Sequence, residues 1–193
     1  MTFPVAGGKM VGMDRARTDF PRTWEDVCNN PFLTNLPYRV EINREGNIVL
    51  SPHSRFHSKY QAAIMRLLER LMDGGMSIPE CAIESKGSTP VADVVWISNE
   101  RDAAEKDAFA YTTAPEICIE VRSPSNSLRE MQAKRQEYFE AGAVECWFCN
   151  LTGGMSFYGL EGELERSQLC PDFPKQINFR ESATVPGRVP PRY

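Results

Sequence analysis

The chain has no long hydrophobic run and no dense set of cysteines. No apolar stretch among its 193 residues approaches the roughly 18 residues that a membrane-spanning helix needs. The N-terminal segment also lacks the continuous apolar core of a secretory signal. We therefore expect a cytoplasmic location and no membrane partner. A chain of this length can bury a core without disulfides or structural metals.

Positive charge is also scarce. Lysine and arginine number 22 against 26 aspartates and glutamates, so the formal net charge is −4. Affinity for phosphate comes mainly from clustered lysine and arginine, so a nucleic-acid role would need a local basic face. One predicted helix carries a basic strip, a pattern that is also typical of a solvated surface: Arg55, Lys59, Arg66 and Arg70, with only Glu69 among them.

The six cysteines are scattered along the chain and do not form a disulfide framework. Cys146 and Cys149 form a C-x-x-C pattern, but the residues around them predict a strand. Positions three apart in a strand point to opposite faces of the sheet. We therefore interpret these cysteines as buried structural thiols, not as a redox or zinc motif.

The pattern of apolar residues predicts a mixed sheet flanked by helices, of the α/β or α+β class. We expect an N-terminal arm over residues 1–36 with a short helix near Trp24, a domain over 37–170, and a proline-containing tail over 171–193. Within this division, long helices are predicted at about 54–72 and 127–141, and a short one at 99–106. Strands are predicted at 38–43, 47–50, 80–85, 91–97, 116–122, 145–150, 155–160 and 163–169.

A carboxylate interrupts one of the apolar strand faces. Strand alternation places Asp93 on the same face as Val91 and Val95. A carboxylate among apolar side chains costs several kcal/mol unless it is paired, protonated or bound to a cation. Asp93 is either hydrogen-bonded to a loop, or on a face that turns outward, or part of a functional site.

The next long strand repeats the feature. Glu120 and Arg122 share the face opposite the apolar row of Ile117, Ile119 and Val121. This pattern fits a half-exposed strand with an ion pair, but it also fits a ligand site at the ends of neighbouring strands. Two carboxylates held close together repel each other unless a proton or divalent cation lies between them.

Both long helices carry polar residues on or near their apolar sides. In the first helix, His57 and Gln61 lie within the apolar arc near the helix start, which suggests a polar pocket beneath it. A single inward histidine is otherwise a hydrogen-bonded core residue. In the second helix, Lys134 and Arg135 lie at or inside the arc. Their charged heads either extend to solvent or reach a buried acidic site.

Taken together, these segments resemble a known family. The pieces are Pro37-Tyr-Arg-Val-Glu41 with Gly46, Ser51-Pro with His57, Asp93-Val-Val, Glu120-Val-Arg-Ser-Pro124, Glu130 with Lys134 and Tyr138, and Gly142 with Glu145-Cys-Trp147. In this order they are similar to the restriction-endonuclease family that is abundant in cyanobacterial genomes, a branch of the PD-(D/E)xK nuclease superfamily. The resemblance covers residues 38–150 and implies a restriction-endonuclease-like fold.

The resemblance also implies roles for individual residues. Asp93 and Glu120 match the two carboxylates that bind Mg²⁺ in the superfamily, and the Val121 carbonyl is a further candidate ligand. Lys134 matches the motif's lysine, moved to the helix fourteen residues after Glu120. Glu41 matches an upstream acidic position, and His57 a histidine at the start of the first helix.

Two positions depart from the family pattern. Ala92 replaces the proline that usually precedes the aspartate, which is a small chemical change because proline supplies no ligand. Arg122 stands where this family usually has an apolar residue, at the superfamily's own lysine position. A guanidinium does not act as a base in this pH range, but it can clamp a phosphate.

The expected function is therefore a Mg²⁺-dependent endonuclease, with Mn²⁺ as an alternative ion, that cuts DNA as a homodimer. In this hypothesis Lys134 orients or deprotonates the attacking water or stabilises the pentacovalent phosphate, and Glu41 holds a second metal or activates water. His57, Arg122 and Gln61 bind phosphate. A catalytically degenerate nucleic-acid-binding or assembly module is the main alternative, and a hydrolase of another phosphate ester, such as a nucleotide or RNA, is a third.

Overall fold

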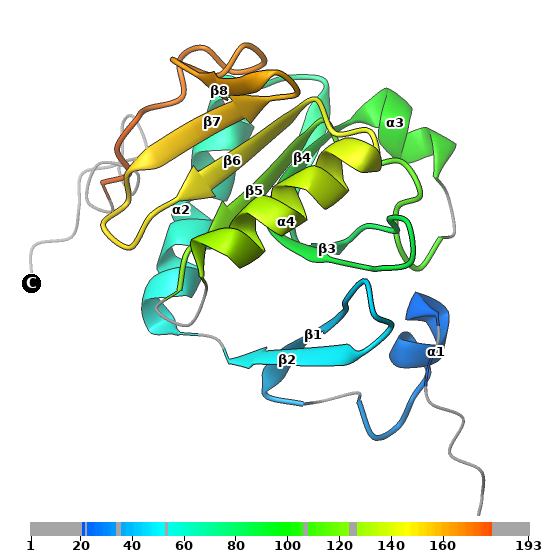
Figure 1. Ribbon diagram of the computed structural model, residues 1–193. Helices are drawn as coiled ribbons and strands as arrows, with labels where there is room; N and C mark the ends of the chain where they lie inside the picture. The colour runs from blue at the N-terminus through cyan, green and yellow to red at the C-terminus, as the bar shows by residue number, and fades with distance from the viewer. Residues whose placement is uncertain are drawn as a thin grey trace, which may run out of the picture.

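The structure is a computed structural model that describes residues 21, 23–33, 36–52, 54–105, 108–123 and 127–178. A six-stranded sheet runs in the order β3-β4-β5-β6-β7-β8, and β1 and β2 form a separate hairpin (Figure 1). Its strands are β3 (Gly75–Ala82), β4 (Val91–Ser98), β5 (Ile117–Val121), β6 (Glu145–Cys149), β7 (Met155–Gly159) and β8 (Gly162–Leu164).

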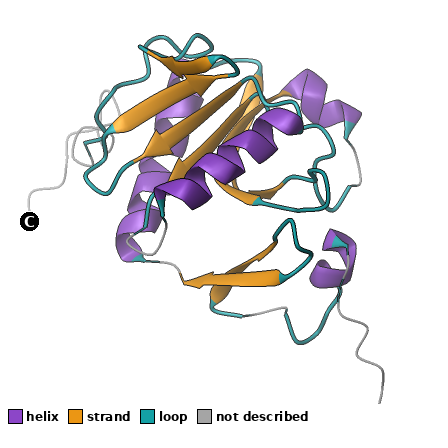
Figure 2. Cartoon of the chain, viewed as in Figure 1, coloured by secondary structure: helices purple, strands orange, loops and turns teal. Residues whose placement is uncertain are grey.

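The sheet is mixed. Its neighbours pair antiparallel except for β5 and β6, which are parallel and joined through helix α4 (Leu128–Glu140). Helix α2 (Arg55–Leu71) and helix α4 cover opposite faces of the sheet, as Figure 2 shows. This arrangement confirms the predicted class, a mixed α/β sheet flanked by helices.

Two apolar layers hold the helices on the sheet. On the α2 side, the helix buries Ile64 and Leu68 against Trp96, Ile119 and Trp147. On the α4 side, Tyr138 packs with smaller residues, namely Val95, Cys118 and Cys146. Because strand residues alternate between these layers, both faces of β4 and β5 are buried, and any charge on them needs a partner.

Both long helices begin at a capped end close to the sheet. The Ser54 hydroxyl accepts a hydrogen bond of 3.2 Å from the His57 backbone N–H, and this fixes the first turn of α2. In α4, Ser127 and Glu130 cap each other reciprocally. The first cap helps to fix where the His57 side chain enters the molecule.

The hairpin of β1 (Tyr38–Ile42) and β2 (Ile48–Pro52) lies beside the β3 end of the molecule, near the short helix α1 (Trp24–Cys28) (Figure 1). Its turn contains Gly46 with a φ of 74°, a left-handed conformation that favours glycine. Backbone hydrogen bonds of 3.2 and 2.8 Å between Ile42 and Thr89 tie the hairpin to the loop before β4. The inward face of β1 is thereby brought to the end of β4.

Most predicted elements match the structure, including α1 near Trp24 and α3 (Asn99–Ala104), but β3 begins five residues before the predicted residue 80. β3 pairs with β4 from Gly75 to Ala82. It contains Pro79, which predicts against a strand, but β3 is an edge strand and a missing N–H is tolerated there. The predicted strand 163–169 is reduced to the three residues of β8.

The polypeptide after β8 packs against the sheet as far as residue 178. Phe173 and Ile177 are buried in the α2-side layer, and Phe173 lies 4.6 Å from Trp147 between ring centroids. Packing therefore continues beyond the predicted boundary at residue 170. The rest of the predicted tail, residues 179–193, and most of the predicted arm, residues 1–20, lie outside the described residues.

The C-x-x-C pattern lies in β6, and its two cysteines point to opposite faces of the sheet. Cys146 belongs to the α4-side layer and Cys149 to the α2-side layer. All six cysteines are free thiols. Burial raises the pKa of Cys81 and Cys149 to about 12, and it raises the pKa of Cys118 and Cys146 well above the ordinary value. These cysteines are structural, as predicted.

We predict that a thiol reagent such as Ellman's reagent discriminates sharply between the cysteines of the folded protein. Near pH 8, half-buried Cys28 should react first, and the buried thiols on the order of 100-fold or more slowly, because they react only through local or global opening. In denaturant all six should react quickly. Rapid reaction of both Cys146 and Cys149 with the reagent in the native state would contradict the interpretation that they are structural thiols.

A second prediction concerns Glu145, which is 2% exposed. Its carboxylate accepts hydrogen bonds from the Trp147 indole (2.7 Å) and from the backbone N–H groups of Gln168 (2.7 Å) and Leu169 (3.0 Å). Glu145→Ala leaves three donors unpaired and should lower the free energy of unfolding by about 3 kcal/mol or more in urea titrations. Glu163→Ala, on exposed β8, is the matched control and should change the free energy of unfolding by less than about 0.5 kcal/mol.

Candidate active site

Three acidic residues form a row across neighbouring strands. Pro79 pairs with Val94 and Cys81 with Ala92, so Glu80 of β3 lies opposite Asp93 of β4. Val94 also pairs with Ile119, and the next step along both strands places Glu120 of β5 beside Asp93. Like charges opposite each other destabilise a sheet unless protons or positively charged groups offset them.

Asp93 lies at the centre of the row and is fully buried. Its Oδ2 accepts a hydrogen bond of 2.6 Å from the Val121 backbone N–H. Its Oδ1 accepts a hydrogen bond from the Arg39 guanidinium and lies 3.2 Å from the His57 Nε2. The carboxylate is therefore held in one orientation by groups from β1, α2 and β5.

Glu120 is held by α4, the helix that covers the face of the sheet opposite α2. The Tyr138 hydroxyl donates a hydrogen bond to Oε1, and the Lys134 ammonium lies 3.4 Å from each carboxylate oxygen. Burial raises the pKa of Tyr138 well above its usual value, and the negative charges of Glu120 and Glu41 raise it further. Tyr138 thus stays a hydrogen-bond donor throughout the neutral range.

Glu41 comes from the hairpin and joins the two sides. Its Oε1 accepts a hydrogen bond from Lys134 and one of 3.2 Å from the Val91 backbone N–H. The same oxygen lies 3.5 Å from the Arg39 Nε. Lys134 therefore bridges Glu41 and Glu120, and Arg39 bridges Glu41 and Asp93.

A second cluster surrounds Asp93 on the α2 side. His57, Glu80 and Asp93 offer ligand atoms that all lie within 4.8 Å of one another. The Gln61 amide donates a hydrogen bond to Glu80 and another of 3.0 Å to the Asp93 backbone carbonyl. Glu80 has a φ of 51°, which is uncommon for a residue other than glycine and costs of order 1 kcal/mol or more.

The structure brings together most of the residues singled out from the sequence: Glu41, His57, Gln61, Asp93, Glu120 and Lys134. Val121 contacts the site through its N–H, which binds Asp93. Arg135 does not join the acidic groups, because its guanidinium lies over the Tyr158 ring, 4.4 Å from the centroid.

Arg122 follows Glu120 by two positions, just beyond the end of β5. Its backbone N–H donates a 2.8 Å hydrogen bond to the Cys149 carbonyl, which extends the pairing of β5 with β6. Its Nε atom is buried and has no hydrogen-bond partner among the described residues. A buried donor of this kind is suited to a phosphate oxygen.

Sequence reasoning did not assign Arg39, Glu80 or Tyr138 to the site. Strand alternation could have identified Arg39, since it shares the inward face of β1 with Glu41. Tyr138 lies one helical turn after Lys134 and belongs to the family pattern, which assigned it no role. No signal in the sequence pointed to Glu80, because its role depends on the β3–β4 register.

The donor set fits a hard divalent cation. Carboxylate oxygens suit Mg²⁺ and Mn²⁺, and the imidazole of His57 is a further ligand that suits Mn²⁺ better than Mg²⁺. Asp93 belongs both to the predicted pair with Glu120 and to the cluster with His57 and Glu80. Asp93 is therefore the residue on which either metal position depends.

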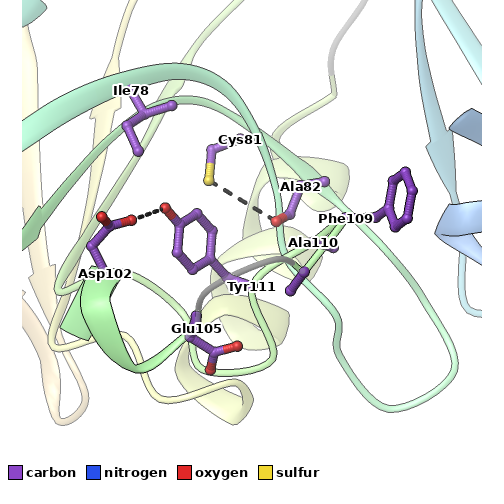
Figure 3. A pocket seen from close by; sticks show the side chains of 9 residues that line it. Ile78, Cys81, Ala82, Asp102, Glu105, Phe109, Ala110 and Tyr111 are labelled. Carbon is purple, nitrogen blue, oxygen red and sulfur yellow. Dashed lines mark hydrogen bonds between the residues drawn. The ribbon is translucent and has the colours of Figure 1, made fainter.

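Two pockets lie near these strands. A groove of about 480 Å³ between the hairpin and α4 is lined by Glu41 and Lys134 and gives access to that side of the site. A pocket of about 430 Å³ beside β3 contains Cys81 and Tyr111, and Figure 3 shows the Tyr111 hydroxyl bonded to Asp102. It shares no lining residue with the acidic site.

The mixed sheet flanked by helices is a nuclease-like fold. Residues 24–178 match the model of the family described as "Uma2: Putative restriction endonuclease", and the chain belongs to this family. The match spans most of the chain and agrees with the family resemblance found in the sequence.

A solved structure shares the fold. A "putative nuclease belonging to DUF820" from Anabaena variabilis is similar with a TM-score of 0.63 and 16% sequence identity, over 84% of this chain and 97% of that chain. No curated protein matches the sequence. Among the described residues, no helix is both long and apolar enough to cross a membrane.

We predict that Tyr138→Phe weakens the site in a pH-dependent way. At pH 8 the loss of a donor to a buried carboxylate should lower the free energy of unfolding by about 1.5–3 kcal/mol. The pKa of Tyr138 is raised in the folded protein, whereas an unfolded tyrosine ionises near pH 10. The contribution of the Tyr138 hydroxyl to the free energy of unfolding is therefore fully present below about pH 10 and is lost as the pH rises further. The difference between the two proteins should therefore narrow above about pH 10 in urea titrations, and a constant difference would contradict this account.

Proposed function

We propose that the protein is a Mg²⁺-dependent endonuclease that hydrolyses phosphodiester bonds in DNA. The observation that carries this proposal is the position of Lys134, which lies 3.4 Å from both oxygens of Glu120 and contacts Glu41. This lysine lies next to the buried carboxylates of the row. Phosphodiester hydrolysis needs such a combination of acidic ligands and a nearby fixed positive charge.

Asp93 and Glu120 are the residues that would hold the ion, with the Val121 carbonyl as a further ligand. When bound, Mg²⁺ or Mn²⁺ supplies charge neutralisation at the phosphate oxygens and activation of water. In this proposal Lys134 orients the attacking water and stabilises negative charge on the phosphate. Glu41 orients Lys134 through their ion pair.

In this proposal, side chains next to the acidic row of Glu80, Asp93 and Glu120 bind the phosphate. Arg122 carries a buried donor without a partner among the described residues, and a guanidinium binds phosphate oxygens well. His57 and Gln61 remain candidates for positioning the scissile phosphate, although Gln61 already bonds Glu80 and the Asp93 carbonyl. A pair of such sites suits the cutting of both strands of a duplex, so we expect a homodimer.

One observation favours the second candidate, a degenerate nucleic-acid-binding or assembly module. The Arg39 guanidinium occupies Asp93 Oδ1, an oxygen that the ion would use. Calorimetry with Mn²⁺ and with a DNA duplex separates the candidates. An endonuclease should bind Mn²⁺ in a way that depends on Asp93, whereas a degenerate module should bind DNA without binding metal.

We predict that the purified protein nicks supercoiled plasmid in the presence of Mg²⁺ or Mn²⁺ and that Glu120→Gln lowers the rate by roughly 100-fold or more. The variant removes a charge that neutralises the ion while keeping the size of the side chain. Glu163→Gln, on exposed β8, is the matched control and should cut at the wild-type rate. Cleavage that survives both EDTA and Glu120→Gln would refute the proposal.

A further inference from the structure

Arg39 is the most unusual group in the site, because it is a buried cation among acidic side chains. Its side chain is 7% exposed, and Nη1 bonds Asp93 Oδ1 while Nε lies 3.5 Å from Glu41 Oε1. Nη1 also lies 3.5 Å from the Val91 carbonyl. The guanidinium therefore spans the two carboxylates that face each other between the hairpin and β4.

The charges around Arg39 hold it in its ionised form. Burial lowers the pKa of Arg39, but the negative charges of Glu120, Glu41 and Glu80 outweigh burial and raise it above the ordinary value. In the described part of the site, four carboxylates (Glu41, Glu80, Asp93 and Glu120) face the basic side chains of Arg39 and Lys134, with His57 beside Asp93. Negative charge remains in excess, which attracts a further cation.

A divalent ion bound to Asp93 would have to share that carboxylate with Arg39. Oδ2 accepts the Val121 N–H as part of the link between β4 and β5, and Oδ1 is contacted by both Arg39 and His57. A guanidinium and a divalent ion repel each other strongly at the distance set by one carboxylate. The ion therefore gains full access to Asp93 only when Arg39 leaves Oδ1.

We propose that Arg39 is a built-in competitor for the metal: it holds Asp93 and Glu41 in place when no metal is bound and weakens the binding of a divalent ion to Asp93. Arg39 is thus a positioning residue that sets the metal affinity of the site. The inference rests on the metal site of the proposed function, but it requires neither cleavage nor DNA.

The test is the affinity for Mn²⁺ alone, measured by calorimetry on the full chain at one fixed pH. Arg39→Met replaces the guanidinium with a neutral side chain that also fills space and should tighten Mn²⁺ binding by about 10-fold or more. Arg39→Lys keeps a positive charge and should stay within about threefold of the wild type. A wild-type or weaker affinity in Arg39→Met would overturn the proposal.

Two controls place the effect at Asp93. Arg166→Met removes an exposed arginine on the segment after β8, away from the hairpin, and it should leave the Mn²⁺ affinity unchanged. Asp93→Asn in the Arg39→Met background should abolish the gain. If the gain persists in that double variant, the ion binds elsewhere and the proposal fails.

Arg39→Met also leaves buried carboxylates without a partner, so its folding is measured by circular dichroism with and without Mn²⁺. If the variant unfolds without metal, Mn²⁺ should restore the folded signal, and failure to restore it overturns the proposal.

Plasmid nicking separates this proposal from the proposed endonuclease function. Tight Mn²⁺ binding by Arg39→Met without cleavage by any variant refutes the endonuclease alone, whereas wild-type cleavage with unchanged Mn²⁺ affinity in Arg39→Met refutes the competition alone.

Discussion

The buried carboxylate of Asp93 is the constraint on which the site depends. A charge in the middle of a sheet covered on both faces is tolerated only when every oxygen has a partner. Those partners come from three separate elements: Arg39 from the hairpin, His57 from α2, and the Val121 N–H from β5. Placing this one carboxylate therefore fixes the hairpin, the start of α2 and the end of β5 relative to one another.

The same constraint explains why the acidic residues form a row across three strands. Antiparallel pairing places Glu80, Asp93 and Glu120 at one level of the sheet. A shift of one residue in either register would separate them and point their side chains to other faces. Strands give the carboxylates a more rigid support than loops do, which suits a site whose function depends on the distances between charges.

Much of this arrangement could be predicted from the sequence because it follows from local periodicity. Alternation placed Asp93 and Glu120 on strands, and helical spacing turned His57, Gln61 and Lys134 inward. The family resemblance indicated that these residues belong to one site, and the structure brings their side chains together. Arg39 lies on the same face of β1 as Glu41, but a lysine or arginine in a short strand usually points to solvent. The role of Glu80 could not be predicted, because it depends on an edge strand that contains Pro79.

The hairpin forms its own two-stranded sheet and meets the rest of the molecule through the Ile42–Thr89 backbone pair and through the charges of Arg39, Glu41 and Arg44. Units attached in this way open at a lower free energy than the whole domain. When the hairpin opens, Asp93 loses its cation and Lys134 loses Glu41, while the six-stranded sheet stays folded. The population of intact sites therefore depends on the docking of some fifteen residues of hairpin as well as on the stability of the core.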